Sequence, residues 1–378
     1  MMKETRLSVV YPPDMTFRDV GSGQTMPNQG DLAAIAKRLT LSPVMIRMAL
    51  GGHEVGHLIP PGLRERVLVI ANEIEPCSIG TSFFPLSNSS YTMGIVIPEV
   101  ADGYLTAVLN GVEKELFQAG YLHTVVCHHG QEDLLTAYAA SLVNGGVDGL
   151  IFINSMLPTP QNVPSVALSN HQSAAWTTTI QIDHDLAAEL ALKHLLDLGH
   201  HRIAFIRGQK ESLDAESRWA SLLYVAKTLD LDIHEEMCLQ LEENEWSPHL
   251  GYPVIRDLLA RKADFTAICC FNDFAAMGAI RALREAGLSC PEDVSVIGFD
   301  DIQGAEYCEP ALTTIRQPLK RMGSLAARVL LDKINYPEAK FPKSILIQPS
   351  LIIRSSTAGV SSIRRRGKTN LQRPRRAN

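Results

Sequence analysis

Residues 272–318 read NDFAAMGAIRALREAGLSCPEDVSVIGFDDIQGAEYCEPALTTIRQP. Together with the apolar run before it, this stretch has the order strand, polar residue, helix, strand, polar residue. In an open parallel sheet, polar groups just beyond the carboxyl ends of the strands face the ligand crevice. The stretch therefore predicts an α/β domain that binds a ligand. Its parts, in chain order, are the apolar run 265–271, Asn272, the helical spacing over 274–286, the apolar run 294–299 and Asp300.

The same alternation of short apolar runs and helical spacing extends back through most of the chain. It predicts parallel sheets, because a parallel strand pair needs a crossover element between its strands. We expect strands at 93–97, 122–127, 148–153, 165–168, 179–182, 202–206, 265–271 and 294–298. We expect helices at 103–119, 132–144, 185–198, 215–229, 251–261 and 274–286.

Length and composition exclude several classes of protein. A chain of 378 residues exceeds the usual size of one domain. It contains no apolar stretch of about 18 residues for a membrane span and no apolar signal-peptide core in its first residues, so we expect a cytoplasmic protein. The seven cysteines lack metal or disulfide spacing, and we expect neither a metal nor a cofactor.

No enzyme signature occurs in the sequence. The chain lacks GxSxG, HExxH, a P-loop, and a GxGxxG motif after a strand. An enzyme on a doubly wound fold therefore remains only as a rival interpretation, because no nucleophile and base are placed together.

The segment 31–75 has helix-turn-helix spacing. Two short helical patterns flank a turn, the second is capped by Ser42 with Pro43 at its first position, and a third pattern covers 61–74. In such a motif the second helix lies in the DNA major groove with its early exposed residues against the base edges. The candidate DNA-binding residues are Ser42, Val44, Met45, Arg47 and Met48.

The motifs ND, AMGA, GL, P.DVSVIGFDD and PALTTIRQP, in this order and spacing, resemble the effector-binding core of the LacI/GalR family of bacterial transcription regulators. The resemblance extends over about 31–355. It implies an α/β fold of two doubly wound, parallel-sheet subdomains like periplasmic binding proteins, preceded by a small all-α helix-turn-helix domain. It also implies a homodimer that binds a double-stranded DNA operator and holds a small-molecule effector, a sugar or nucleoside-like compound, in a cleft between the subdomains.

Composition at the two ends of the chain and the resemblance between them predict the following division of the chain. Residues 1–30 form a disordered leader, 31–75 the DNA-binding head, 76–91 a hinge or linker, 92–356 the core, and 357–378 a basic disordered tail. The family's core has three crossovers, which we expect near residues 177, 302 and 333. Subdomain one then covers about 92–177 and 302–333, and subdomain two about 178–301 and 334–356.

The resemblance also implies the effector-binding residues Tyr104, Arg218, Trp246, Asn272 and Asp300. A guanidinium fork, carboxylate and amide groups, and a flat aromatic side chain suit a sugar-like ligand. Each residue has a structural alternative: Arg218 can pair with Asp214 or Glu216, Trp246 can be core, and Asp273 can cap the following helix. Asp273 and Asp301 are assigned first to capping and interface roles, and Ser169 stands where many sugar-binding relatives have aspartate.

The head departs from the family pattern. The chain has Thr40 where the turn usually has glycine, and Met45, Arg47 and Met48 where threonine, serine and arginine are usual. Five basic and five acidic residues between 31 and 80 give the head no net charge, whereas seven of the basic residues lie in 359–378. A neutral head should bind DNA weakly unless its bases share one face. The resemblance nevertheless leads us to expect a transcriptional regulator, a repressor controlled by its effector. The alternative is a cytoplasmic small-molecule binding module with a degenerate head.

Overall fold

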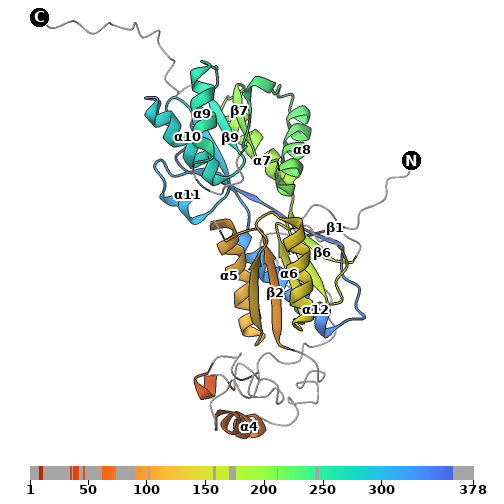
Figure 1. Ribbon diagram of the computed structural model, residues 1–378. Helices are drawn as coiled ribbons and strands as arrows, with labels where there is room; N and C mark the ends of the chain where they lie inside the picture. The colour runs from red at the N-terminus through yellow and green to blue at the C-terminus, as the bar shows by residue number, and fades with distance from the viewer. Residues whose placement is uncertain are drawn as a thin grey trace, which may run out of the picture. The chain divides into compact units, whose positions relative to one another are not determined.

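The computed structural model describes residues 8–11, 35, 37–41, 46, 62–73, 90–100, 103–155, 159–169, 176–210, 212–242, 247 and 249–360 (Figure 1). The chain divides into two compact units. Unit 1 comprises Met1–Asp183 and Pro318–Gln348, and unit 2 comprises His184–Gln317 and Pro349–Asn378. Each unit is built around its own β-sheet, so the two parallel-sheet α/β subdomains expected from the sequence are confirmed.

Unit 1 contains a parallel sheet of seven strands in the order β1-β12-β6-β5-β4-β2-β3. Helices α5 and α12 cover one face and α6 covers the other. The strands are β1 Ser8–Tyr11, β2 Thr92–Ile97, β3 Leu122–Cys127, β4 Gly149–Ile153, β5 Ser165–Leu168, β6 Thr178–Ile182 and β12 Ser344–Ile347. The helices are α5 Gly103–Gln118, α6 Glu132–Asn144 and α12 Leu319–Asn335.

Unit 2 contains a sheet of six strands in the order β13-β11-β10-β9-β7-β8, in which only β13 is antiparallel. Helices α7 and α8 share one apolar cluster with the sheet, and α9 and α10 share another. The strands are β7 Ile203–Arg207, β8 Cys238–Gln240, β9 Ala267–Cys270, β10 Ser295–Asp300, β11 Thr313–Arg316 and β13 Ser350–Ile352. The helices are α7 His184–Asp197, α8 Leu213–Thr228, α9 Gly251–Ala260, α10 Asp273–Glu285, α11 Gln303–Tyr307 and the 3₁₀ turn η3 Glu235–Met237.

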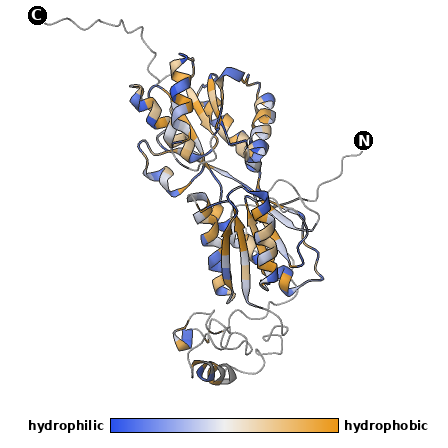
Figure 2. Ribbon diagram, in the orientation of Figure 1, coloured by the Kyte–Doolittle hydropathy of each residue, from blue (hydrophilic) through white to orange (hydrophobic). Residues whose placement is uncertain are grey.

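The central strands are apolar on both faces because helices cover both sides of each sheet. All five residues of β4 and all six of β10 are buried. Such continuous apolar runs are typical of parallel strands, and Figure 2 shows hydrophobic residues along the strands and on the inward helix faces. This explains why the strand positions were predictable from short apolar runs.

The contact between α5 and α12 depends on two glycines. A Cβ atom built on Gly111 would lie 2.0 Å from the carbonyl oxygen of Lys320, and one on Gly323 would lie 2.0 Å from the carbonyl oxygen of Val108. The same helices are joined by a bidentate ion pair, in which Nε and Nη2 of Arg328 each lie 2.8 Å from the buried carboxylate of Glu115. The two helix backbones therefore touch without side chains between them.

The crossovers between the units lie later in the chain than the sequence predicted. They fall at 183/184, 317/318 and 348/349 instead of near 177, 302 and 333. The predicted boundaries are wrong because strand pairing places β6 and β12 in the sheet of unit 1 and β11 in the sheet of unit 2.

Two terminal segments are more ordered than expected. Within the predicted disordered leader, β1 pairs with β12 at the edge of the unit 1 sheet. Within the predicted disordered tail, the amide of Val360 donates to the carbonyl of Leu198, and His200 bonds the carbonyl of Ala358. At these residues the expectation of disorder is wrong, because backbone hydrogen bonds tie both segments to the units.

Little of the predicted head lies within the described residues. The third helix is confirmed as α4 Leu63–Glu73, with Leu63 and Val67 buried, while Ser42, Val44, Met45, Arg47 and Met48 lie outside them. Thr40 has φ of 56°, a left-handed conformation that favours glycine and explains why glycine is usual at this turn. Among the described residues, no helix has the length and apolar character of a membrane span.

Candidate functional site

Three of the five predicted effector-binding residues lie at the carboxyl edge of the unit 2 sheet. Asn272 follows β9, Asp300 ends β10, and Arg218 of α8 reaches the end of β9. Strands β9 and β10 are neighbours in the sheet, so their ends lie together. Tyr104 belongs to unit 1, and Trp246 lies outside the described residues.

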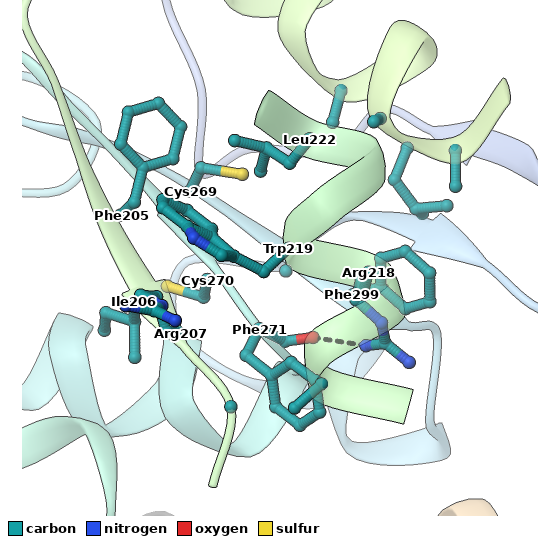
Figure 3. A pocket seen from close by; sticks show the side chains of 17 residues that line it. Phe205, Ile206, Arg207, Arg218, Trp219, Leu222, Cys269, Cys270, Phe271 and Phe299 are labelled. Carbon is teal, nitrogen blue, oxygen red and sulfur yellow. Dashed lines mark hydrogen bonds between the residues drawn. The ribbon is translucent and has the colours of Figure 1, made fainter. Parts of the chain in front are cut away.

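Arg218 is held by three kinds of contact, of which Figure 3 draws the hydrogen bond to Phe271. Its Nη1 donates to the carbonyl oxygen of Phe271 at 2.5 Å, its Nη2 pairs with Asp214 one helical turn earlier, and its guanidinium lies over the rings of Phe271 and Phe299 at 4.4 and 3.7 Å. The predicted alternative of an Asp214 pair is therefore present. Nε of Arg218 is buried and finds no acceptor in the described part of the chain, so a donor remains on a fixed planar group.

Asn272 is the N-cap of α10. Its Oδ1 accepts a hydrogen bond of 2.9 Å from the amide of Ala275. Asn272 is therefore the cap, whereas the structural alternative had given this role to Asp273. Its Nδ2 is buried, and no described residue accepts from it. Because the amide oxygen is used by the helix, Asn272 can offer a ligand only a donor.

Asp300 has an unusual backbone. Its φ is 106°, a backbone conformation that residues other than glycine rarely adopt, and the following Asp301 has φ of 55°. The Nε2 of Gln317 donates to Oδ1 of Asp300 at 2.7 Å, and Asp301 forms ion pairs with Arg316 and Arg354. Asp301 thus holds the turn through charge pairs within unit 2.

Asp273 supports the same turn from inside the unit. Its carboxylate accepts from the amide of Ile302 at 2.9 Å and from Oγ1 of Thr314 at 2.6 Å, and only 1% of the residue is exposed. Burial raises the pKa of the Asp273 carboxyl group to about 7, although the two hydrogen bonds oppose this shift. The residue acts in the core and not as a helix cap.

This raised pKa predicts a pH dependence of stability. The unfolded chain loses the Asp273 proton near pH 4 and unit 2 loses it only near pH 7, so unfolding becomes easier as the pH rises between these values. The expected loss is about 1.4 kcal/mol per pH unit. Urea unfolding of wild type and Asp273→Asn between pH 5 and 7 checks this: the difference between the two free energies of unfolding should change by that slope. A constant difference contradicts it.

The carboxyl edge of the unit 1 sheet carries a hydrogen-bonded cluster around Tyr104. The Tyr104 hydroxyl lies 2.6 Å from Oγ of Ser169, which follows β5, and donates to Oδ1 of Asn154, which follows β4, at 3.3 Å. Asn154 and Ser169 both have positive φ, 47° and 53°, so the strand ends turn sharply at these residues. The serine that stands in place of aspartate is therefore a direct neighbour of Tyr104.

A second pair at this edge was not predicted from the sequence. Nε2 of His128, which follows β3, lies 2.9 Å from Oγ of Ser155, which follows Asn154. Both residues are buried. Their only signal in the sequence is that each stands just after a predicted strand.

A cavity lies within unit 2 beside Arg218 (Figure 3). It opens between α7, α8 and the sheet, and its volume is about 40 Å³. Ligand pockets usually measure about 300–1,000 Å³, so this cavity alone does not hold a sugar. Its wall is mostly apolar and includes four aromatic residues and two arginines, namely Phe205, Arg207, Arg218, Trp219, Phe271 and Phe299.

Metal binding finds no support in the described part of the chain. No group of three or more His, Cys, Asp or Glu side chains is arranged there to hold an ion. The described cysteines are all free thiols.

Comparison with known proteins agrees with this fold. A family model described as a periplasmic binding protein-like domain matches residues 192–357. The HTH-type transcriptional repressor PurR of Erwinia tasmaniensis is 31% identical over 336 residues, which cover 84% of this chain and 97% of that protein.

Solved structures give the same result. A LacI family transcriptional regulator from Enterococcus faecium with bound ribose has a TM-score of 0.64 and 28% identity, covering 71% of this chain and 99% of that one. The dimeric lac repressor with an 11-residue C-terminal deletion has a TM-score of 0.65 and 25% identity, covering 71% and 99%. These relatives are regulators, and none of the three is named as an enzyme.

Proposed function

The chain belongs to the LacI/GalR family of effector-controlled, DNA-binding transcriptional regulators, and on that premise we propose that it is a cytoplasmic repressor whose effector is a sugar or a nucleoside. The proposed effector contacts are Arg218, Asn272 and Asp300 of unit 2 and Tyr104 of unit 1, with Trp246 as the covering aromatic. We propose no catalytic activity for this site.

The observation that carries this proposal is a pair of buried donors at the end of β9 that find no acceptor in the described parts of the chain. Nε of Arg218 and Nδ2 of Asn272 are both buried and lack an acceptor among the described residues. Leaving a buried donor unpaired costs about 1–3 kcal/mol, so a folded protein tolerates two of them where a ligand pairs them. Hydroxyl and carbonyl oxygens of a sugar or a nucleoside are suitable acceptors.

The proposed DNA-binding element is the head at 31–75, including Ser42, Val44, Met45, Arg47 and Met48, in a homodimer. Dimeric helix-turn-helix proteins read two half-sites about one helical turn apart. An effector changes operator affinity only by its different affinity for the two conformational states, about 1–3 kcal/mol in typical cases. The related PurR and lac repressor proteins are named repressors, which supports repression as the direction of control.

A thermal-shift screen tests the effector class. The panel consists of D-ribose, D-xylulose, cellobiose, adenosine and guanosine. A compound present at 100 times its dissociation constant adds about 2.7 kcal/mol to the free energy of unfolding and raises the melting temperature by several degrees. At least one compound is expected to do so, and no shift with any of the five contradicts the proposed effector class.

A DNA-binding titration across salt concentrations tests the regulator against the binding module. With genomic operator fragments, the logarithm of the binding constant should fall with the logarithm of salt with a slope of about −4 or steeper, because each phosphate contact contributes about −0.9. A variant that ends at Val360 separates the basic tail from the head. Specific protection should survive this truncation, whereas a flat response and no protected sequence favour the binding module.

A further inference from the structure

His128 and Ser155 lie on either side of the carboxyl end of strand β2 and contact each other there. In the unit 1 sheet β2 lies between β3, which precedes His128, and β4, which precedes Ser155. The 2.9 Å contact between His128 Nε2 and Ser155 Oγ therefore places the imidazole over the carboxyl end of β2. Ligands of open parallel sheets bind outside the carboxyl ends of the strands.

The hydrogen bonds of Ser155 define which imidazole nitrogen carries the proton. The hydroxyl of Ser155 donates to the carbonyl oxygen of Ile153 at 2.8 Å. Because a serine hydroxyl has one hydrogen, Ser155 can only accept from His128. Nε2 of His128 therefore carries the hydrogen, and Nδ1 of the neutral ring has a free lone pair.

The ring remains neutral under ordinary conditions. Burial lowers the pKa of His128, and the neighbouring His129 lowers it further. His128 is 6% exposed, its Nδ1 is buried, and no donor in the described residues pairs with that nitrogen. Because Nδ1 is buried and no described residue donates to it, a donor from a bound molecule would satisfy its lone pair.

The neighbouring groups are also uncharged hydrogen-bonding groups. Tyr104, Asn154 and Ser169 follow or face the ends of the adjacent strands and already bond one another. A neutral imidazole acceptor beside hydroxyl and amide groups matches a ligand that presents hydroxyls or a ring N–H.

We propose that His128 is a specificity-determining residue of the effector site, whose Nδ1 accepts a hydrogen bond from a hydroxyl or ring N–H of the effector while Ser155 fixes the tautomer. This inference rests on the proposed function, because it assigns His128 to the same effector. It adds a contact that neither the sequence motifs nor the resemblance to the family pointed to.

Two substitutions of His128 distinguish the contribution of Nδ1 from that of Nε2. His128→Asn places an amide group near the position of Nδ1 and removes the bond to Ser155, whereas His128→Gln keeps a donor for Ser155 and removes the acceptor. With the panel compound that shifts the wild type most, titration calorimetry should show an affinity about ten-fold lower for His128→Gln and within about three-fold of the wild type for His128→Asn. His123→Gln, an exposed position on β3, is the matched control and should bind like the wild type.

Nitrogen NMR of the full chain labelled with ¹⁵N-histidine reports the protonation and hydrogen bonding of each ring nitrogen. If His128 had only a structural role, adding the compound would not change its Nδ1 chemical shift. The chain has 12 histidines, and the signal missing from His128→Gln identifies His128. We expect a proton on Nε2, a bare Nδ1 without compound, and an upfield shift of the Nδ1 resonance when the compound binds.

Each result decides one of the two proposals. Equal affinity of the wild type and His128→Gln, a proton on Nδ1, or an Nδ1 resonance that ignores the compound overturns the role of His128 and leaves the effector class intact. If no panel compound binds the wild type, the effector class fails and the role of His128 fails with it. Melting temperatures of both variants near that of the wild type exclude misfolding as the cause of lost binding.

Discussion

Replacing Arg218 by lysine is expected to lower the affinity for the effector about 30- to 100-fold while unit 2 remains folded. Lysine keeps the positive charge beside Asp214, but it lacks the planar fork that reaches the carbonyl of Phe271 and stacks between the rings of Phe271 and Phe299. A hydrogen bond from a charged group contributes about 1.5–3 kcal/mol, which corresponds to this loss.

The comparison with Arg218→Ala separates binding from folding. Alanine removes the ion pair between Arg218 and the largely buried carboxylate of Asp214, which keeps its 3.1 Å contact with His184, so this variant should also lower the melting temperature. Calorimetry with the best panel compound measures affinity, and thermal unfolding measures stability. The exposed i,i+4 pair of Arg281 and Glu285 offers a control, since Arg281→Lys should change neither quantity. Wild-type affinity in Arg218→Lys contradicts the proposed role.

Gly111→Ala is expected to destabilise unit 1 by about 2 kcal/mol. The new methyl group would lie 2.0 Å from the carbonyl oxygen of Lys320 and 2.8 Å from the amide nitrogen of Ser324. Both atoms belong to the backbone of α12, so the helices must separate along their whole contact. Overpacking of a tight contact costs about 1–3 kcal/mol or more, which outweighs the gain of about 1 kcal/mol in helix propensity.

Urea unfolding followed by circular dichroism measures this effect. Asn110→Ala changes the preceding, exposed residue of the same helix and is the matched control, which should be neutral or slightly stabilising. Gly323→Ala approaches the same contact from α12, where its methyl group would meet the carbonyl of Val108 at 2.0 Å. Unchanged stability in Gly111→Ala and Gly323→Ala contradicts a backbone-to-backbone contact.

The positions of helices and strands were predicted from the sequence more accurately than the unit to which each element belongs. Helix α6 has the predicted bounds, and strands such as β4 were recognisable because helices cover both of their faces. Strands β8, β12 and β13 are three or four residues long and show no periodicity that distinguishes them from loops. The position of β12 is fixed by pairing with β1 and β6, which are distant in the sequence, and no local pattern contains that information.

The site was predicted where a strand end coincides with a distinctive side chain. Asn272 and Asp300 were found in this way, but the capping bond of Asn272 and the left-handed backbone of Asp300 became evident only from the structure. His128 and Ser155 come from loops after different strands, and their contact depends on the order of β3, β2 and β4 in the sheet. Spatial order, unlike spacing, is not present in a single sequence.

The chain order of the two units constrains how the protein is made. Helix α12 and strand β12 complete unit 1, yet the ribosome synthesises them only after it has synthesised the whole of His184–Gln317. Until then the growing polypeptide exposes the face of the sheet that α12 will cover and the edge of β6. Unit 1 therefore cannot complete its fold until unit 2 has been synthesised. A chain truncated after residue 317 would lack α12 and β12 of unit 1 and β13 of unit 2, and chaperones and proteases would act on it.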